Sequence, residues 1–327
     1  MRAAFSLWRG LGGLALAALA IGSAAAQSAP PAGAPPGAAI PPPPFLQSSP
    51  GLTGALSKIA RLGAVTLGYR EASVPFSFLD RAGRPIGYSM DICAAIVEEI
   101  GRTLGRDDLK VAYEKVTSET RLQAVADGKV DLECGSTTAN AERAKIVSFS
   151  PMIFVAGAKV MVARTTPWAD FRSLKGKTVA ATSGTTTVAA LKKLDERFGL
   201  GVKLVEAPDH EQAYQLLVDG KVDGVANDDV LLAGLIAQHK SGDRFKVAGE
   251  LLSYDPYGIA YAHADRPMRE AIERAFRTLA KSNEIDFIYD KWFKRPLPNG
   301  EAFRIPMSPQ LEEAFRTFET EIEHQSE

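Results

Sequence analysis

A short internal repeat is the strongest indication of the fold. The sequence Asp-Gly-Lys-Val-Asp ends both Val125–Asp131 and Leu217–Asp223. In each copy a helix is expected to end at the Asp-Gly pair, and a strand to begin at the lysine. A single short repeat of this kind would also arise if both segments merely used the same favoured helix-to-strand turn. However, polar clusters follow both strands, at Gly135–Thr138 and at Asn227–Asp229, so we predict two similar α/β lobes.

Strands and helices alternate around the repeat. Val65–Leu67 is predicted to be a strand and Phe76–Tyr88 a hairpin. A helix is expected to start at Ser89 and to end at Gly101, because isoleucines recur every fourth residue between them. This alternation is typical of an α/β fold, in which ligands bind at the carboxyl ends of the strands.

The chain is expected to leave the first lobe, build the second and return. Two β-type runs, Ile153–Ala163 and Gly258–Ala262, fall where it would cross. A helix at Pro267–Leu279 has one apolar face and is expected to pack on the first lobe. The predicted organisation is therefore a signal peptide (1–26), a tether rich in Pro and Ala (27–55), a discontinuous first lobe (56–157 and 256–327) and a second lobe (158–255).

The first residues are typical of a cleaved export signal. Arg2 and Arg9 are followed by the apolar run Leu11–Ile21 and by the small residues Ala24–Ala26. The run is too short to span a bilayer comfortably, so cleavage after Ala26 and a periplasmic location are expected. The formal net charge of −1 disfavours nucleic acid as a partner.

Cys93 and Cys134 are the two cysteines of the chain. In an oxidising compartment they are compatible with a disulfide, and they are equally compatible with two buried free thiols. The sequence leaves both states open, since it does not place the two α-carbons.

Catalytic and metal-binding templates match poorly. The four histidines lack the spacing of a helical metal site, and His263-Ala264-Asp265 alone is weak support for one. Lys175–Thr178 resembles the end of a phosphate-binding loop, but Phe171 stands where the upstream glycine is required. Ser183 lacks the surroundings of a nucleophile elbow. No catalytic residue, metal ligand or cofactor is predicted.

Binding chemistry fits better. Ser136 and Thr138 follow a strand, with Arg143 a few residues later, and Thr185 and Thr186 open a predicted helix. Hydroxyl groups, a guanidinium and the free amides of a helix start together suit a carboxylate. Asp228, at the opposite strand end, would accept hydrogen bonds from an ammonium group.

A set of motifs occurs in a fixed order along the predicted folded region, from about Leu56 to Pro298. They are Gly68–Glu71, Val74–Ser77, Gly87–Asp91, Glu133–Thr138, Glu142–Arg143, Leu174–Lys177, Thr182–Thr186, Asp228–Asp229, Leu231–Gly234 and Asp290–Phe293. In these motifs the chain resembles the periplasmic substrate-binding proteins of polar amino-acid ABC transporters (bacterial solute-binding protein family 3), and within them the type that binds glutamate and aspartate.

The resemblance implies a two-lobed fold with two crossing hinge strands and a ligand cleft between the lobes. It implies that Arg143, Thr138 and Thr186 bind the α-carboxylate, with Thr185 as an alternative to its neighbour, and that Asp228, Ser136 and Thr138 hold the α-ammonium. Further residues match positions that bind the side-chain carboxylate of the ligand: Arg70, Ser118, Arg121 and His210.

Charge supports this assignment. Two arginines at one end of a pocket repel each other and are costly to desolvate unless an anion binds. An acidic ligand is therefore expected over an amide. Taken alone, Arg121 would also suit a surface site beside Glu119 or Asp127, and His210 a structural role near a helix start.

The predicted function is a monomeric receptor that closes on L-glutamate or L-aspartate and delivers it to an inner-membrane permease powered by a separate ATPase. It is not expected to be an enzyme. The alternatives are a dehydratase-like enzyme on the same fold and a ligand-sensing module that acts through a membrane partner.

Overall fold

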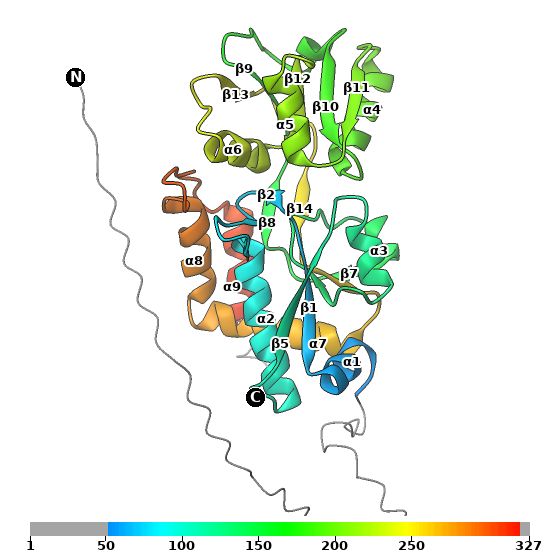
Figure 1. Cartoon of the computed structure of the whole chain (residues 1–327), viewed down its shortest axis with the longest axis vertical. Coiled ribbons are helices and arrows are strands. Elements are labelled where there is room, and N and C mark those ends of the chain that lie inside the picture. The colour runs from blue at the N-terminus through cyan, green and yellow to red at the C-terminus, as the bar shows by residue number, and fades with distance from the viewer. Residues whose placement is uncertain (1–51, 321–327) are drawn as a thin grey trace, which may run out of the picture. The chain divides into compact units, whose positions relative to one another are not determined.

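Two five-stranded sheets organise residues 52–320, the part of the chain that the computed structural model describes (Figure 1). The α/β fold predicted from the alternating pattern is confirmed. The predicted signal peptide and residues 27–51 of the predicted tether lie outside the described residues. Helix α1 begins at Gly54 and not at Leu56, where the first lobe was predicted to start.

The first sheet has the strand order β5-β1-β6-β15-β7. Strands β5, β1 and β6 are parallel, whereas β15 lies antiparallel between β6 and β7. We call this sheet and its helices the first lobe. Its strands are β1 (Ala64–Tyr69), β5 (Lys110–Lys115), β6 (Leu132–Glu133), β7 (Val147–Phe149) and β15 (Ala260–Ala262), with a small sheet of β2 (Ala72–Ser73), β3 (Ser77–Leu79) and β4 (Pro85–Ile86).

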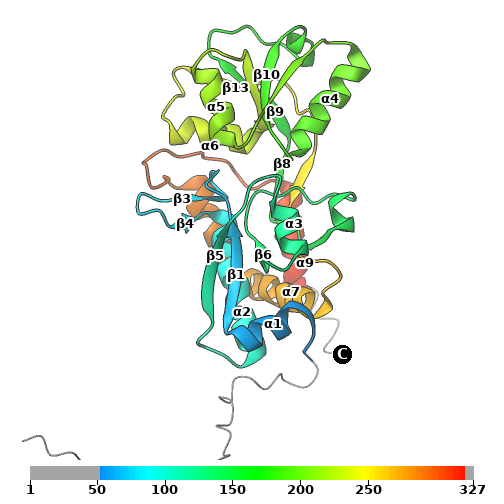
Figure 2. The same cartoon turned by 45° about the vertical axis from the view of Figure 1, so that its right-hand side comes forward.

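Six helices and two shorter helical turns accompany this sheet among the described residues. Helix α7 packs against α1 and α2 (Figure 2), and its predicted apolar face is buried, as expected for the returning helix. The elements are α1 (Gly54–Leu62), α2 (Tyr88–Leu104), α3 (Arg121–Ala126), α7 (Arg266–Lys281), α8 (Glu284–Tyr289), α9 (Pro309–Thr320), the 3-10 turn η2 (Arg143–Lys145) and the π-helical turn η4 (Asp290–Lys294).

The second sheet repeats the plan of the first, in the order β11-β10-β12-β9-β13. Three strands are again parallel, and β9 lies antiparallel between β12 and β13. We call this sheet and its helices the second lobe. Its elements are β9 (Ala158–Ala163), η3 (Phe171–Leu174), β10 (Thr178–Thr182), α4 (Thr186–Phe198), β11 (Lys203–Ala207), α5 (His210–Val218), β12 (Gly224–Asp228), α6 (Asp229–Gln238) and β13 (Phe245–Ala248).

The two copies of the sequence repeat occupy corresponding places in the two sheets. The first copy links α3 to β6, and the second links α5 to β12. Both strands pair in parallel with the first of the parallel strands of their lobe, β1 or β10, and in antiparallel with their other neighbour, β15 or β9. The repeat therefore marks an architectural correspondence between the lobes, as the sequence predicted.

The lobes are joined by two antiparallel strands, β8 (Phe154–Ala156) and β14 (Asp255–Tyr257) (Figure 1). The first crossing lies within the predicted run Ile153–Ala163. The second crossing precedes the predicted run Gly258–Ala262, whose last three residues form β15 inside the first sheet. Buried apolar residues suit a central strand as well as a crossing strand, so the sequence pattern did not separate the two.

Aromatic side chains anchor both crossing strands in the core of the first lobe. The ring of Phe76 contacts those of Phe154 and Tyr257 edge to face, each at 5.1 Å between centroids. Phe293 stacks on Phe154 at 4.8 Å. Such pairs contribute about 0.5–1.5 kcal/mol each beyond area burial. The strands that connect the lobes are thus fixed firmly at their first-lobe ends.

Helix α2 differs from the prediction at both ends. Gly87 and not Ser89 precedes its first turn, and the Ser89 hydroxyl donates to the Gly135 carbonyl at 2.7 Å. The helix passes Gly101 and ends at Gly105, whose φ of 62° is left-handed. Gly101 is instead a site of close approach, because a Cβ there would lie 2.8 Å from the Arg106 carbonyl oxygen. Within residues 52–320 no helix is both long and apolar enough to cross a bilayer.

Candidate ligand-binding site

The predicted site residues lie where the carboxyl ends of parallel strands in the two lobes face each other. Arg70 directly follows β1, and Ser136 and Thr138 follow β6. In the second lobe, Thr186 follows β10 and Asp228 ends β12. Of the ten predicted residues, all except Thr185 and Thr186 are buried, and those two are half-buried.

Several of these residues contact each other across the lobes. The Thr138 and Thr186 hydroxyl oxygens lie 3.3 Å apart. Arg143 donates from Nη1 to the Thr138 carbonyl at 2.9 Å, and from Nη2 to the Gly184 carbonyl of the second lobe at 3.2 Å. The predicted carboxylate-binding group is thus assembled from both lobes.

Three arginines, Arg70, Arg121 and Arg143, form a buried cluster that we call the arginine cluster. Burial, together with the charge of Arg121, lowers the pKa of Arg70 to about 9 and that of Arg143 to about 10. Burial also lowers the pKa of Arg121 itself, which is only 2% exposed, so its alternative interpretation as a surface residue is wrong. Desolvated cations held together in this way favour an anion between them.

Several buried polar atoms near this cluster have no hydrogen-bond partner within residues 52–320. They are Arg70 Nη1, Arg121 Nε, Ser118 Oγ, Ser136 Oγ, His210 Nε2 and Glu133 Oε1. All except the last are able to donate a hydrogen bond. Because a buried donor without a partner costs about 1–3 kcal/mol, their concentration indicates a site built for an acceptor-rich ligand.

His210, the first residue of α5, contributes one of these donors. Its Nδ1 lies 2.7 Å from the Thr182 hydroxyl and 3.0 Å from the Asn227 side-chain nitrogen. Since an amide nitrogen only donates, Nδ1 accepts and the ring proton is on Nε2. Burial and the nearby arginine charges hold the pKa of His210 well below its usual range, so the ring is neutral.

The start of α4 supplies further donors. Thr185 precedes the helix, but its hydroxyl donates to the Thr182 carbonyl at 2.6 Å and does not cap the helix. Thr186 Oγ1 lies within reach of Thr138 and donates to Asp255 Oδ1 at 2.9 Å. Of the two threonines, Thr186 is therefore the one whose hydroxyl faces the other lobe.

Acidic residues lie opposite these donors. Asp228 accepts hydrogen bonds from the Tyr257 hydroxyl and, at 3.4 Å, from the Thr187 hydroxyl. Burial, followed by the charge of Asp255, raises its pKa to about 7. A positively charged group bound here would favour the ionised form, so this corner suits an ammonium.

Sequence reasoning gave no role to four residues of the site. Thr187, Asp255 and Tyr257 lack any local signal, because their roles arise from contacts with residues far along the chain. Glu133 stands in the quoted motif Glu133–Thr138, yet a single glutamate at a strand end does not reveal what it faces.

The structure joins Cys93 and Cys134 in a disulfide, with the two α-carbons 6.2 Å apart. The sequence had left open a disulfide or two buried free thiols, and the structure shows the disulfide. The bond ties the first half of α2 to the residue after β6, and so fixes the strand end that Ser136 and Thr138 follow.

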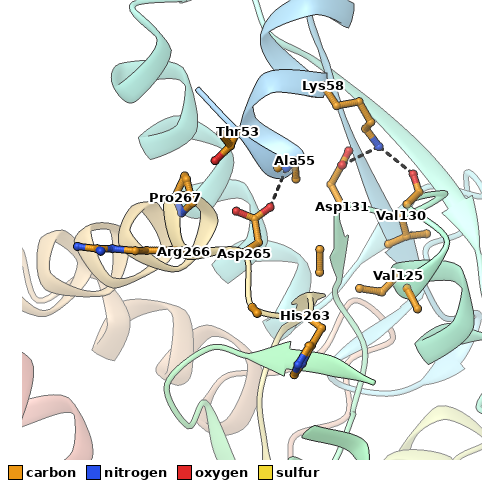
Figure 3. Close-up of a pocket in the computed structure, with 15 residues that line it drawn as sticks. Thr53, Ala55, Lys58, Val125, Val130, Asp131, His263, Asp265, Arg266 and Pro267 are labelled. Carbon is orange, nitrogen blue, oxygen red and sulfur yellow. Dashed lines mark hydrogen bonds and ion pairs between the residues drawn. The ribbon is translucent and has the colours of Figure 1, made fainter. Parts of the chain in front are cut away.

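A separate pocket of about 520 Å³ lies in the first lobe, near the start of α7 (Figure 3). Asp265 accepts from the backbone nitrogens of Ala55 at 2.7 Å and Met268 at 3.1 Å, and Lys58 pairs with Asp131 at 2.7 Å. Asp265 therefore accepts hydrogen bonds from the first turns of both α1 and α7. Within residues 52–320, no group of three His, Cys, Asp or Glu side chains is arranged to hold a metal ion, and the region around His263 is no exception.

Comparison with known proteins agrees with this geometry. Residues 65–295 match the bacterial extracellular solute-binding proteins, family 3. An L-glutamate/L-aspartate-binding protein of Pseudomonas aeruginosa is 40% identical over 80% of this chain and 87% of the relative. A glutamate/aspartate import solute-binding protein of Escherichia coli is 36% identical over 77% of this chain and 83% of the relative. Among solved structures, an ancestral arginine-binding protein bound to glutamine has a TM-score of 0.64 and 29% identity, covering 71% of this chain and 98% of that one.

Proposed function

The chain belongs to the bacterial extracellular solute-binding proteins of family 3, and we propose that it is the substrate-binding component of an importer for glutamate or aspartate. The observation that supports this ligand best is the buried arginine cluster, in which Arg70 Nη1 and Arg121 Nε have no hydrogen-bond partner within residues 52–320. The relatives with 36–40% identity carry names for the same two ligands.

Each charged group of an acidic amino acid has a complementary region. We propose that Arg143, Thr138 and Thr186 bind the α-carboxylate, where the guanidinium, the hydroxyls and the start of α4 converge. Asp228 would bind the α-ammonium, assisted by Ser136. Both assignments use groups from the two lobes, so ligand binding would favour the closed arrangement.

The side-chain carboxylate of the ligand would be held by the remaining donors. Arg70 and Arg121 supply the charge, and Ser118 and His210 supply neutral hydrogen bonds. A ligand amide would bring no negative charge to the two desolvated arginines, so acids should be preferred over amides.

Calorimetric titration tests this proposal. The mature protein would be unfolded and refolded to remove any bound ligand, and then titrated with glutamate, aspartate, glutamine and asparagine. Tight binding of the acids with weak binding of the amides is expected. Binding of the amides alone would overturn the ligand assignment and leave the transport role standing.

We propose that the protein releases its ligand unchanged to a permease with a separate ATPase. Incubation with glutamate or aspartate and analysis of the products would reveal turnover, which would favour a dehydratase-like enzyme. A pull-down from membranes that recovers a receptor instead of a permease would favour the sensing role.

We also propose export to the periplasm, with cleavage after Ala26. Amino-terminal sequencing of the protein from a periplasmic fraction tests this, with Gln27 expected first. Size-exclusion chromatography with light scattering tests the proposed monomer.

A further inference from the structure

Glu133 is a fully buried carboxylate at the centre of the site. It lies on β6, between β1 and β15, with 0% of its surface exposed. Its Oε2 accepts a hydrogen bond of 2.5 Å from the Thr137 hydroxyl, and its Oε1 has no partner within residues 52–320. A carboxylate so deeply buried requires a compensating charge nearby.

The stem of Arg70 passes close to this carboxylate. A Cβ atom on Gly135 would lie 2.3 Å from Glu133 Oε1 and 3.0 Å from Arg70 Cγ, so both side chains pack at the position that glycine leaves free. Glycine at 135 is therefore what allows the carboxylate and the arginine to share this space.

The negative charge of Glu133 affects the pKa of all three arginines of the cluster. Burial lowers the pKa of Arg70, Arg121 and Arg143, and the negative charge of Glu133 opposes that lowering in each case. Among the described residues, however, Glu133 forms no direct ion pair with any of the three. It therefore stabilises the cluster as a whole and leaves the guanidinium N–H groups available for a ligand.

We propose that Glu133 is the internal counter-ion of the arginine cluster, and that its charge competes with the side-chain carboxylate of an acidic ligand. The second half of this proposal rests on the proposed function. Glu133 is a positioning residue that acts through the arginines. Glu133 would therefore have two opposing effects: it stabilises the ligand-free protein, and it limits the affinity for acidic ligands.

Glu133→Gln tests the proposal, because glutamine has the same size and still accepts the hydrogen bond from Thr137. In calorimetry, the variant should bind glutamate about tenfold more tightly relative to glutamine than the wild type does. In urea, the ligand-free variant should unfold at a lower concentration. An unchanged or reduced preference for glutamate over glutamine would overturn the competition.

Asp131→Asn is the matched control. Asp131 is also a buried carboxylate of the same segment, but it pairs with Lys58 and accepts from the Thr66 backbone nitrogen at the opposite end of the strand (Figure 3). The control should lose stability without altering the ratio of the two affinities. An equal change of the ratio in both variants would show a general structural effect and refute the proposal.

A double-mutant cycle in the ligand-free protein separates this proposal from the proposed function. If Glu133 compensates the arginines, Glu133→Gln should destabilise much less when Arg121→Gln is already present. Additive effects would refute the counter-ion role. A wild type that binds no acid, together with clear coupling in the cycle, would refute the proposed ligand and leave the counter-ion role intact. If Glu133→Gln does not fold, Glu133→Met, which also removes the charge and is of similar size, replaces it in both tests.

Discussion

Gly234 provides a direct test of whether ligand binding requires the lobe contact seen here. It lies inside α6 of the second lobe and faces the β2–β3 turn of the first. A Cβ atom on Gly234 would lie 2.2 Å from the Val74 carbonyl oxygen and 2.9 Å from its carbonyl carbon. Because Cβ atoms essentially never approach closer than 3.0 Å, Gly234→Ala should separate the lobes by about 0.8 Å at this point.

The expected loss of ligand affinity in the Gly234→Ala variant follows from the hydrogen bonds between the two lobes. If the second lobe moves as a rigid body, the Arg143–Gly184 bond of 3.2 Å and the Thr138–Thr186 contact of 3.3 Å both lengthen to about 4 Å and are lost. Together, one charged and one neutral hydrogen bond contribute about 2 kcal/mol or more, which corresponds to an increase of about 30-fold in Kd.

The same substitution should not weaken the fold. Alanine inside a helix is about 1 kcal/mol more favourable than glycine, so the open protein should be at least as stable as the wild type. Calorimetry with glutamate and urea unfolding without ligand measure the two effects separately. Gly242→Ala is the control, because a Cβ there meets only Ile236 at an ordinary 3.7 Å. Wild-type affinity in the Gly234→Ala variant would refute the reasoning.

Four further predictions concern the site and the disulfide. Arg143→Ala should remove most of the affinity for every amino acid, because it deletes both a bond between the lobes and the proposed donor to the α-carboxylate; calorimetry measures the loss. Arg121→Gln should weaken glutamate binding by about tenfold or more and glutamine binding much less, and equal losses would contradict the division of the pocket. Because Asp228 has a pKa raised to about 7, it must lose a proton to bind an ammonium; affinity should therefore fall as the pH drops below about 7, and calorimetry in buffers of different ionisation enthalpy should detect proton release. Replacing Cys93 and Cys134 by serine should lower the free energy of unfolding by about 4 kcal/mol, given the separation of 41 residues, as measured by urea denaturation.

The two-lobed α/β architecture could be predicted from local sequence patterns. The Asp-Gly-Lys-Val-Asp repeat predicted two similar lobes, because a helix end and a strand start each depend on a few adjacent residues. The polar groups at Thr138 and Asp228 were predicted for a related reason: parallel strands place their carboxyl ends at one edge of a sheet, so residues just after them gather there. Arg70 and Arg121 came from the family resemblance, since neither position carries a local signal of its own.

The tertiary structure decided which of these groups face each other and what each one costs to bury. Arg121 could have been a surface residue, and only its burial beside two other arginines supports its place in the proposed anion site. The disulfide depends on the distance between a helix and a strand, which spacing along the chain does not determine. Glu133 shows the limit most clearly: its charge acts on three arginines that lie 63, 12 and 10 positions away in the sequence. Electrostatic effects depend on distance and burial in space, and these exist only once the chain has folded.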